Sequence, residues 1–150
     1  MTTQETAEGV RDAMLANDTV LRTLGIAVSQ VSPGCASTTM TVRADMLNGF
    51  AICHGGLVTT LADTAFAYAC NSHNELSVAS GFTVDLLAPS VEGDVLTAQA
   101  QEVSKSGRTG LYDIEVRNQR NERIAVFRGR SYTLKGRPVI GGAPVTRSRS

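Results

Sequence analysis

The feature that most constrains this chain is a long segment, residues 55–71, that is apolar on nearly every side. It opens with Gly55-Gly56, is rich in alanine, and is broken by Asn71-Ser72. At helical spacing its apolar residues cover almost the whole circumference of a helix. A surface helix needs only one such face, whereas this one has to be covered all round. The segment therefore predicts a buried helix that is enclosed by other parts of the chain or by another chain.

Strand patterns precede and follow this helix. Two short helices are predicted over residues 5–24, followed by a β-hairpin over residues 26–42 that turns at Pro33-Gly34. Four further strands, predicted to form a meander, cover residues 77–87, 94–104, 109–119 and 123–134. The pattern therefore predicts an α+β fold in which one antiparallel sheet wraps around one central helix.

These elements are predicted to form one domain over residues 1–134. A length of 150 residues and a hydrophobic fraction of 42% fit a single ordinary core. Residues 135–150 contain Gly, Pro, Ser and Arg without periodicity and are predicted to be a disordered tail. Because a helix that is apolar all round also needs cover on its other side, the far face of the sheet, or its open edge, is predicted to meet a second copy. The sequence therefore predicts a homo-oligomer.

Composition excludes several function classes. A net charge of zero and an aromatic fraction of 5% without Trp argue against nucleic-acid binding. Residues 1–100 carry a net charge of −7 and residues 101–150 one of +7, which suits an anionic small molecule. Three cysteines without paired spacing give no disulfide framework, and no metal site is expected. His73 is expected only to cap the helix end or to lie in solvent.

The location is predicted from the absence of targeting patterns in this sequence. The first residues are polar and acidic, unlike a signal peptide. The longest apolar run, Leu57 to Cys70, is too short to cross a membrane and contains Asp63. We therefore expect a cytoplasmic protein that does not bind membranes.

Asp63 is the one formally charged residue between Asp45 and Glu75, and it lies in the middle of the apolar helix. Buried carboxylates without partners are costly, and aspartates in such positions are rare unless they are used. One interpretation is a core aspartate bonded to backbone donors or to Thr64. The favoured interpretation is a catalytic base or nucleophile.

The start of the helix, His54-Gly55-Gly56, suits an oxyanion. The first N–H groups of a helix lack internal partners, and glycine lets a ligand approach the backbone closely. Together with Asp63, these donors predict an acyl-transfer site. Eight residues of helix separate Gly55 from Asp63 by about 12 Å. Both act on one carbonyl only if Asp63 comes from a second subunit.

The segment HGGLVTTLAD, residues 54–63, resembles the HGGxxxxLxD signature of hotdog-fold thioesterases. Its surroundings over about residues 14–134, including MLNGFAICHGG and TGLYDIEVRNQ, resemble the phenylacetate-degradation PaaI subfamily. The resemblance implies a hotdog fold, with an antiparallel sheet of five or six strands around the long helix. It also implies dimers with shared sites that pair into homotetramers, and hydrolysis of acyl-CoA thioesters without a metal or cofactor.

By position, the resemblance makes Asp63 the nucleophile or general base and the N–H of Gly55 the oxyanion donor. Asn48 matches the polar residue near the thioester, and His54 matches the histidine that orients the loop before the helix. The residues matched to substrate or CoA binding are Gly56, Thr64, Lys105, Gly107, Arg108 and Thr109. The basic side chains of the segment 105–109 suit the CoA phosphates, although a solvated hairpin turn explains the same residues.

The predicted function is an acyl-CoA thioesterase that hydrolyses phenylacetyl-CoA or hydroxyphenylacetyl-CoA to the free acid and CoA. The alternative is a non-catalytic acyl-CoA-binding protein on the same fold, which explains the glycines but not Asp63. A hotdog dehydratase is disfavoured because the chain lacks the histidine arrangement that those enzymes use.

Overall fold

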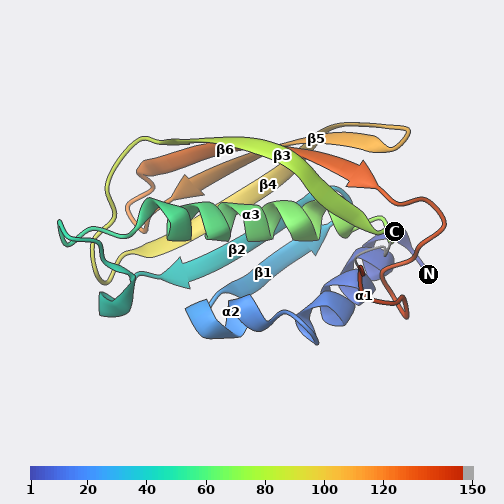
Figure 1. The fold of residues 1–150 in the computed structure, drawn as a ribbon, viewed down its shortest axis with the longest axis horizontal. Coiled ribbons are helices and arrows are strands. Elements are labelled where there is room, and N and C mark those ends of the chain that lie inside the picture. The colour runs from blue at the N-terminus through green and yellow to red at the C-terminus, as the bar shows by residue number, and fades with distance from the viewer. Residues whose placement is uncertain (147–150) are drawn as a thin grey trace.

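The computed structural model describes residues 1–146, in which one six-stranded antiparallel sheet wraps around one long helix (Figure 1). The helices are α1 (Thr3–Leu15), α2 (Thr19–Leu24) and α3 (Gly55–Asn71), with a 3-10 turn η1 at Ala44–Met46. The strands are β1 (Ala27–Ser32), β2 (Cys35–Thr41), β3 (Ser77–Leu86), β4 (Val95–Ser106), β5 (Thr109–Arg117) and β6 (Arg123–Thr133). The predicted architecture, one sheet around one central helix, is confirmed. None of the helices in the described residues is long and apolar enough to cross a membrane.

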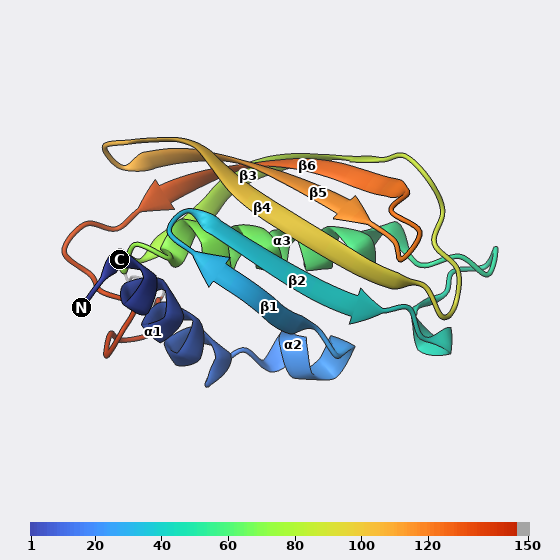
Figure 2. The same ribbon diagram turned by 180° about the vertical axis from the view of Figure 1, so that it is seen from behind.

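Helix α3 is the centre of the core, as its apolar pattern predicts. Leu61, Ala62 and Ala65 are completely buried, and the hydroxyl of Thr38 on β2 donates to the Leu61 carbonyl at 3.1 Å. One face of the sheet packs on α3. The opposite face of the sheet, seen in Figure 2, carries no central helix. A stripe of α3 stays at least partly open: Gly56, Thr59, Thr60, Asp63 and Ala67. We call these five residues the open stripe of α3.

The strand order is β1-β2-β4-β5-β6-β3, so the predicted four-strand meander is wrong for its first strand. β3 pairs with β6, from Ser77 opposite Thr133 to Leu86 opposite Ala125. The chain then crosses the end of the sheet and starts β4 beside β2. Alternation of apolar and polar residues identifies a strand but does not identify its neighbour. The result leaves β3 as an edge strand.

The N-terminal helices lie along the β1 side of the sheet (Figure 2). A capping box starts α1, in which the Thr2 hydroxyl accepts from the N–H of Glu5. Asp18 stands before α2, but its carboxylate accepts from the Tyr68 hydroxyl at 3.1 Å instead of capping that helix. This bond ties the α1–α2 connection to the buried helix α3.

The predicted disordered tail is wrong for its first half, because residues 135–142 fold back on the domain. The side-chain oxygen of Asn74 accepts from the N–H groups of Val139 and Ile140, at 3.0 and 2.9 Å. The Ile140 side chain lies directly over Gly9 of α1. These partners are far away in sequence, so composition alone does not reveal them. The last part of that prediction, residues 147–150, lies outside the described residues.

Candidate active site

The first turn of α3 presents free backbone donors. His54 precedes the helix in an extended conformation, and its side chain makes no cap. The N–H groups of Leu57 and Val58 bond to the His54 carbonyl. Those of Gly55 and Gly56 have no acceptor within residues 1–146. Two unpaired donors therefore stand at the positive end of a 17-residue helix.

The two glycines at this helix start have different surroundings. A Cβ at Gly55 would lie 2.5 Å from Leu86 Cδ1, so the exposed Leu86 side chain of β3 packs directly against this glycine and would have to move for a larger residue. A Cβ at Gly56 would meet nothing within 4 Å. The Leu86 side chain thus covers Gly55, and the space over Gly56 is open.

Asp63 lies two helical turns further on, in the open stripe. Its side chain is half-buried, and burial raises the pKa of its carboxyl. It makes no hydrogen bond to the described residues, and the Thr64 hydroxyl donates instead to the Thr60 carbonyl at 2.7 Å. The interpretation of Asp63 as a satisfied core residue therefore has no support. The hydroxyl hydrogen of the buried Thr64 is used inside the helix, which leaves its oxygen as an acceptor, and the substrate role of Thr64 stays a prediction.

Residues 47–53 form a tight loop directly before α3. The side-chain oxygen of Asn48 accepts from the N–H groups of Phe50 and Ile52, at 2.9 and 3.4 Å. Ala51 takes a left-handed conformation (φ 59°), unusual for a residue with a side chain. The amide nitrogen of Asn48 has no acceptor in the described part of the chain. The loop thus holds Asn48 in place beside the start of α3 with its N–H donors free.

The segment 105–109, predicted to bind CoA phosphates, lies at the opposite end of α3 (Figure 1). It forms the tip of the β4–β5 hairpin, with Gly107 in a left-handed turn conformation (φ 59°). The ammonium of Lys105 is 3.5 Å from a carboxylate oxygen of Glu75, which follows α3. The length of α3, about 25 Å, separates this segment from Gly55 within one chain.

A small cavity of about 310 Å³ opens beside this hairpin. It is lined by Ser80, Ser104, Thr109, Gly110, Leu111, Arg130 and Ser131. The guanidinium of Arg130 has no acidic partner in residues 1–146, in contrast to Arg128, which forms two bonds to Asp113. Hydroxyl groups and a free guanidinium suit an anionic group. Arg130 was outside the segment that the sequence resemblance identified.

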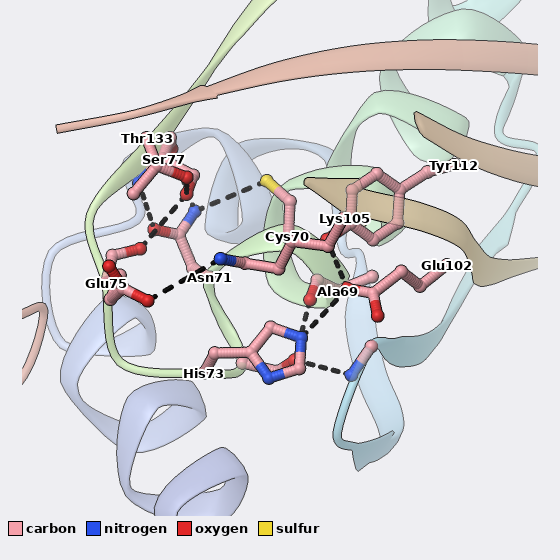
Figure 3. Close-up of polar contacts among 12 residues, drawn as sticks. Ala69, Cys70, Asn71, His73, Glu75, Ser77, Glu102, Lys105, Tyr112 and Thr133 are labelled. Carbon is pink, nitrogen blue, oxygen red and sulfur yellow. Dashed lines mark hydrogen bonds and ion pairs between the residues drawn. The ribbon is translucent and has the colours of Figure 1, made fainter. Parts of the chain in front are cut away.

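His73 is paired, so the prediction that it caps the helix or lies in solvent is wrong. Its Nε2 is 2.8 Å from Glu102 Oε1, and the Tyr112 hydroxyl donates to the same oxygen at 2.7 Å (Figure 3). Burial alone would raise the pKa of Glu102, but the bonds from Tyr112 and His73 outweigh it and hold that pKa below its usual range. His73 and Glu102 are 29 residues apart, and no local signal connects them.

The remaining polar groups at this end of α3 are also satisfied (Figure 3). The Asn71 amide donates to the carbonyls of Ala67 and Ser77, and its oxygen accepts from the Ser77 N–H at 2.8 Å. The Ser72 hydroxyl donates to the Ala69 carbonyl and accepts from the backbone of the β1–β2 turn. This end of the helix is therefore a closed hydrogen-bond network.

Two further features of the described chain, possible metal-ligand clusters and a larger cavity, do not involve the predicted site residues. Within residues 1–146, no group of three or more His, Cys, Asp or Glu side chains is placed to hold a metal ion. A cavity of about 1040 Å³ is lined by α1 and by strands, including Glu8, Asp85 and Arg128. It contains no residue of α3 and none of the predicted site residues.

Comparison with known proteins connects this geometry to a family. The sequence pattern of the Thioesterase superfamily matches residues 50–125. The acyl-coenzyme A thioesterase PaaI of Escherichia coli is 50% identical over 124 residues, covering 83% of this chain and 89% of that protein. The structure of E. coli PaaI, from the phenylacetic acid degradation operon, superposes with a TM-score of 0.88 at 47% identity, over 90% of this chain and 98% of that one.

A second PaaI structure supports the same assignment. A mutant of the phenylacetic acid degradation protein PaaI from Thermus thermophilus superposes with a TM-score of 0.75 at 36% identity, covering 78% of this chain and all of that one. The family match over residues 50–125 includes α3 and the strands β3, β4 and β5. This chain therefore belongs to the thioesterase superfamily, as a thioester hydrolase with the hotdog fold.

Proposed function

We propose that this thioester hydrolase cleaves phenylacetyl-CoA or hydroxyphenylacetyl-CoA to the free acid and CoA. The relatives support this substrate class, since one is an acyl-coenzyme A thioesterase and both PaaI structures are described with phenylacetic acid degradation. The observation that carries the mechanism lies in α3. Two unpaired N–H groups, at Gly55 and Gly56, begin a helix that also bears the unpartnered carboxylate of Asp63.

The N–H of Gly55 donates to the thioester carbonyl oxygen, where negative charge develops during attack. Asp63 either takes a proton from an attacking water or attacks the carbonyl carbon to form an anhydride that water then opens. In both routes a C–O bond forms, the C–S bond breaks, and the CoA thiolate takes up one proton. The free amide of Asn48 holds the thioester, and His54 orients the loop before the helix.

The site requires two subunits, because about 12 Å of helix separates Gly55 from Asp63 in one chain. The donors come from one subunit and the carboxylate from its partner in a homodimer. The edge strand β3 supports this arrangement, since in the described residues it pairs only with β6. Its exposed apolar side chains include Val78 and Leu86. An open edge strand of ten residues is a template for a second copy, and paired dimers would give the homotetramer.

The CoA phosphates are held at the β4–β5 hairpin in this proposal. The segment 105–109 supplies the basic side chains of Lys105 and Arg108, and the neighbouring Arg130 adds a guanidinium without an acidic partner in residues 1–146. Phosphate oxygens are strong acceptors for such donors. The open space over Gly56 leaves room for the substrate arm that leads to the thioester.

The test is the release of free CoA from phenylacetyl-CoA by the wild type and by Asp63→Asn. The substitution keeps the shape of the side chain but removes its charge, so we expect kcat to fall roughly 10²- to 10⁴-fold with an unchanged circular dichroism spectrum. Asp12→Asn, on the exposed surface of α1, is the matched control and should keep its activity.

Each other outcome has a defined meaning. Binding of phenylacetyl-CoA by the wild type without release of CoA would favour the non-catalytic acyl-CoA-binding protein. Equal release by the wild type and Asp63→Asn would preserve the enzyme but overturn the role of Asp63.

A further inference from the structure

Four aromatic rings form a continuous run through the core to the edge of the sheet. Tyr112 and Phe66 have ring centroids 5.5 Å apart, and Phe66 and Phe127 are 5.9 Å apart. Phe82 stacks on Phe127 at 4.7 Å with an angle of 23° between the planes. The first three rings are buried, whereas Phe82 is 42% exposed. The run therefore ends in one open aromatic face.

This open face lies next to the proposed site. Phe66, the second ring of the run, follows Asp63 by about one turn of α3, so the run passes the level of the carboxylate along the helix. Phe82 and Leu86 lie on the same face of β3, four residues apart, and Leu86 contacts the helix start at Gly55. Figure 1 shows β3 passing alongside α3. The exposed ring of Phe82 is thus placed on the side of β3 that faces α3.

The aromatic ring of Phe82 indicates which kind of acyl group would bind next to it. Aromatic rings pair favourably at centroid distances of about 4.5–7 Å, in offset or tilted arrangements, beyond the gain from apolar burial. In an arylacetyl thioester a single CH₂ group separates the ring from the carbonyl carbon. If the thioester carbonyl is held beside Asp63, the substrate's ring therefore lies close enough to contact an aromatic side chain near Asp63.

We propose that Phe82 selects an aromatic acyl group, by receiving the substrate's ring as the next member of this run beside Asp63 of the same subunit. This inference rests on the proposed thioesterase function and adds a specificity-determining residue to it. An aliphatic acyl group gains apolar contact with Phe82 but not the aromatic pair.

The experiment compares kcat/KM for phenylacetyl-CoA and for hexanoyl-CoA in the wild type, Phe82→Leu and Phe82→Tyr. Leucine keeps an apolar side chain and loses the ring, so the ratio of the two values should fall roughly two- to tenfold, as aromatic pair energies imply. Tyrosine keeps the ring and should keep the ratio. Sedimentation velocity of each variant reports whether the assembly is unchanged.

Three results would overturn the role of Phe82. These are an unchanged ratio in Phe82→Leu, an equal fall for both esters, or dissociation of the assembly with loss of both activities, which would make Phe82 an interface residue. Failure of the proposed function looks different, because the wild type would then release CoA from neither ester. In that case the dissociation constants of phenylacetyl-CoA and hexanoyl-CoA are measured for the wild type and Phe82→Leu, and their ratio is compared. A Phe82→Leu variant that weakens the binding of both esters equally would again overturn the proposal.

Discussion

The two ends of helix α3 are built in opposite ways. At the first turn, the N–H groups of Gly55 and Gly56 have no acceptor in residues 1–146. At the last turn, Asn71 and Ser72 satisfy the surrounding backbone, and His73 closes the network through Glu102. The same helix therefore has one end that is available to a ligand and one end that is committed to the fold.

Two carboxylates, Asp63 in the middle of α3 and Glu102 beside its last turn, show the same contrast. Asp63 is half-buried without a partner, and burial raises its pKa. Glu102 accepts bonds from Tyr112 and pairs with His73, which lowers its pKa. An unpaired buried carboxylate reduces stability, whereas a paired one contributes to it. Polar groups of the candidate site therefore lack hydrogen-bond partners in the described residues, whereas those at the last turn of α3 are bonded to one another and hold that end in place.

The largest expected effect on stability is at the closed end. Asn71→Ala removes four hydrogen bonds and leaves the buried N–H and carbonyl of Ser77 without this partner. We expect a loss of about 3 kcal/mol in the free energy of unfolding, measured with urea, because buried unsatisfied groups are costly. The kcat of the folded fraction should stay the same. A fall in kcat without a loss of stability would contradict the division between the two ends.

The open end should respond in activity instead. In Gly55→Ala the new methyl group would lie 2.5 Å from Leu86 Cδ1, so the Leu86 side chain must turn away or β3 must shift relative to α3. A displacement near 1 Å costs roughly 10²-fold in catalysis, and we expect a fall of that order in kcat/KM for phenylacetyl-CoA.

Two further variants sharpen this prediction. Gly56→Ala has nothing within 4 Å of the new methyl group and should cost less than Gly55→Ala. The double variant Gly55→Ala/Leu86→Ala makes room for the methyl group and should recover part of the activity. Equal losses in the two single variants would show that contact with β3 is not the cause.

The smallest effect concerns pH. In the proposed mechanism Asp63 works only in its ionised form, so kcat should fall about tenfold per pH unit below its raised pKa, or about 1.4 kcal/mol per unit. The contribution of Glu102 to stability is present above its unfolded pKa and is lost only as pH falls through its lower folded pKa. On acidification, CoA release should therefore stop before the urea midpoint moves. Loss of both at the same pH would contradict the opposite shifts.

Local patterns predicted much of the fold. The predicted helix 55–71 coincides with α3, and the predicted strand 123–134 differs from β6 by one residue. Both segments are defined by burial periodicity and by glycine or turn residues at their ends. The partner of β3 was missed, because a strand with one apolar face fits several places in a sheet.

The candidate site divides in the same way. Gly55, Gly56 and Asp63 belong to one short segment, so their relation follows from helical geometry. The segment 105–109 lies at the far end of α3, and only the folded chain shows that separation. The catalytic and binding roles of these residues stay predictions that the experiments above test.

The buried helix, its lone carboxylate and its glycine start were recognisable in consecutive residues, because spacing along a helix determines which groups share a face. The edge position of β3, the pairing of His73 with Glu102, and the aromatic run that ends at Phe82 were decided only by tertiary structure. Each depends on contacts between residues far apart in the chain. Local propensity carries no information about such contacts, since their free energy exists only once the sheet has closed around the helix.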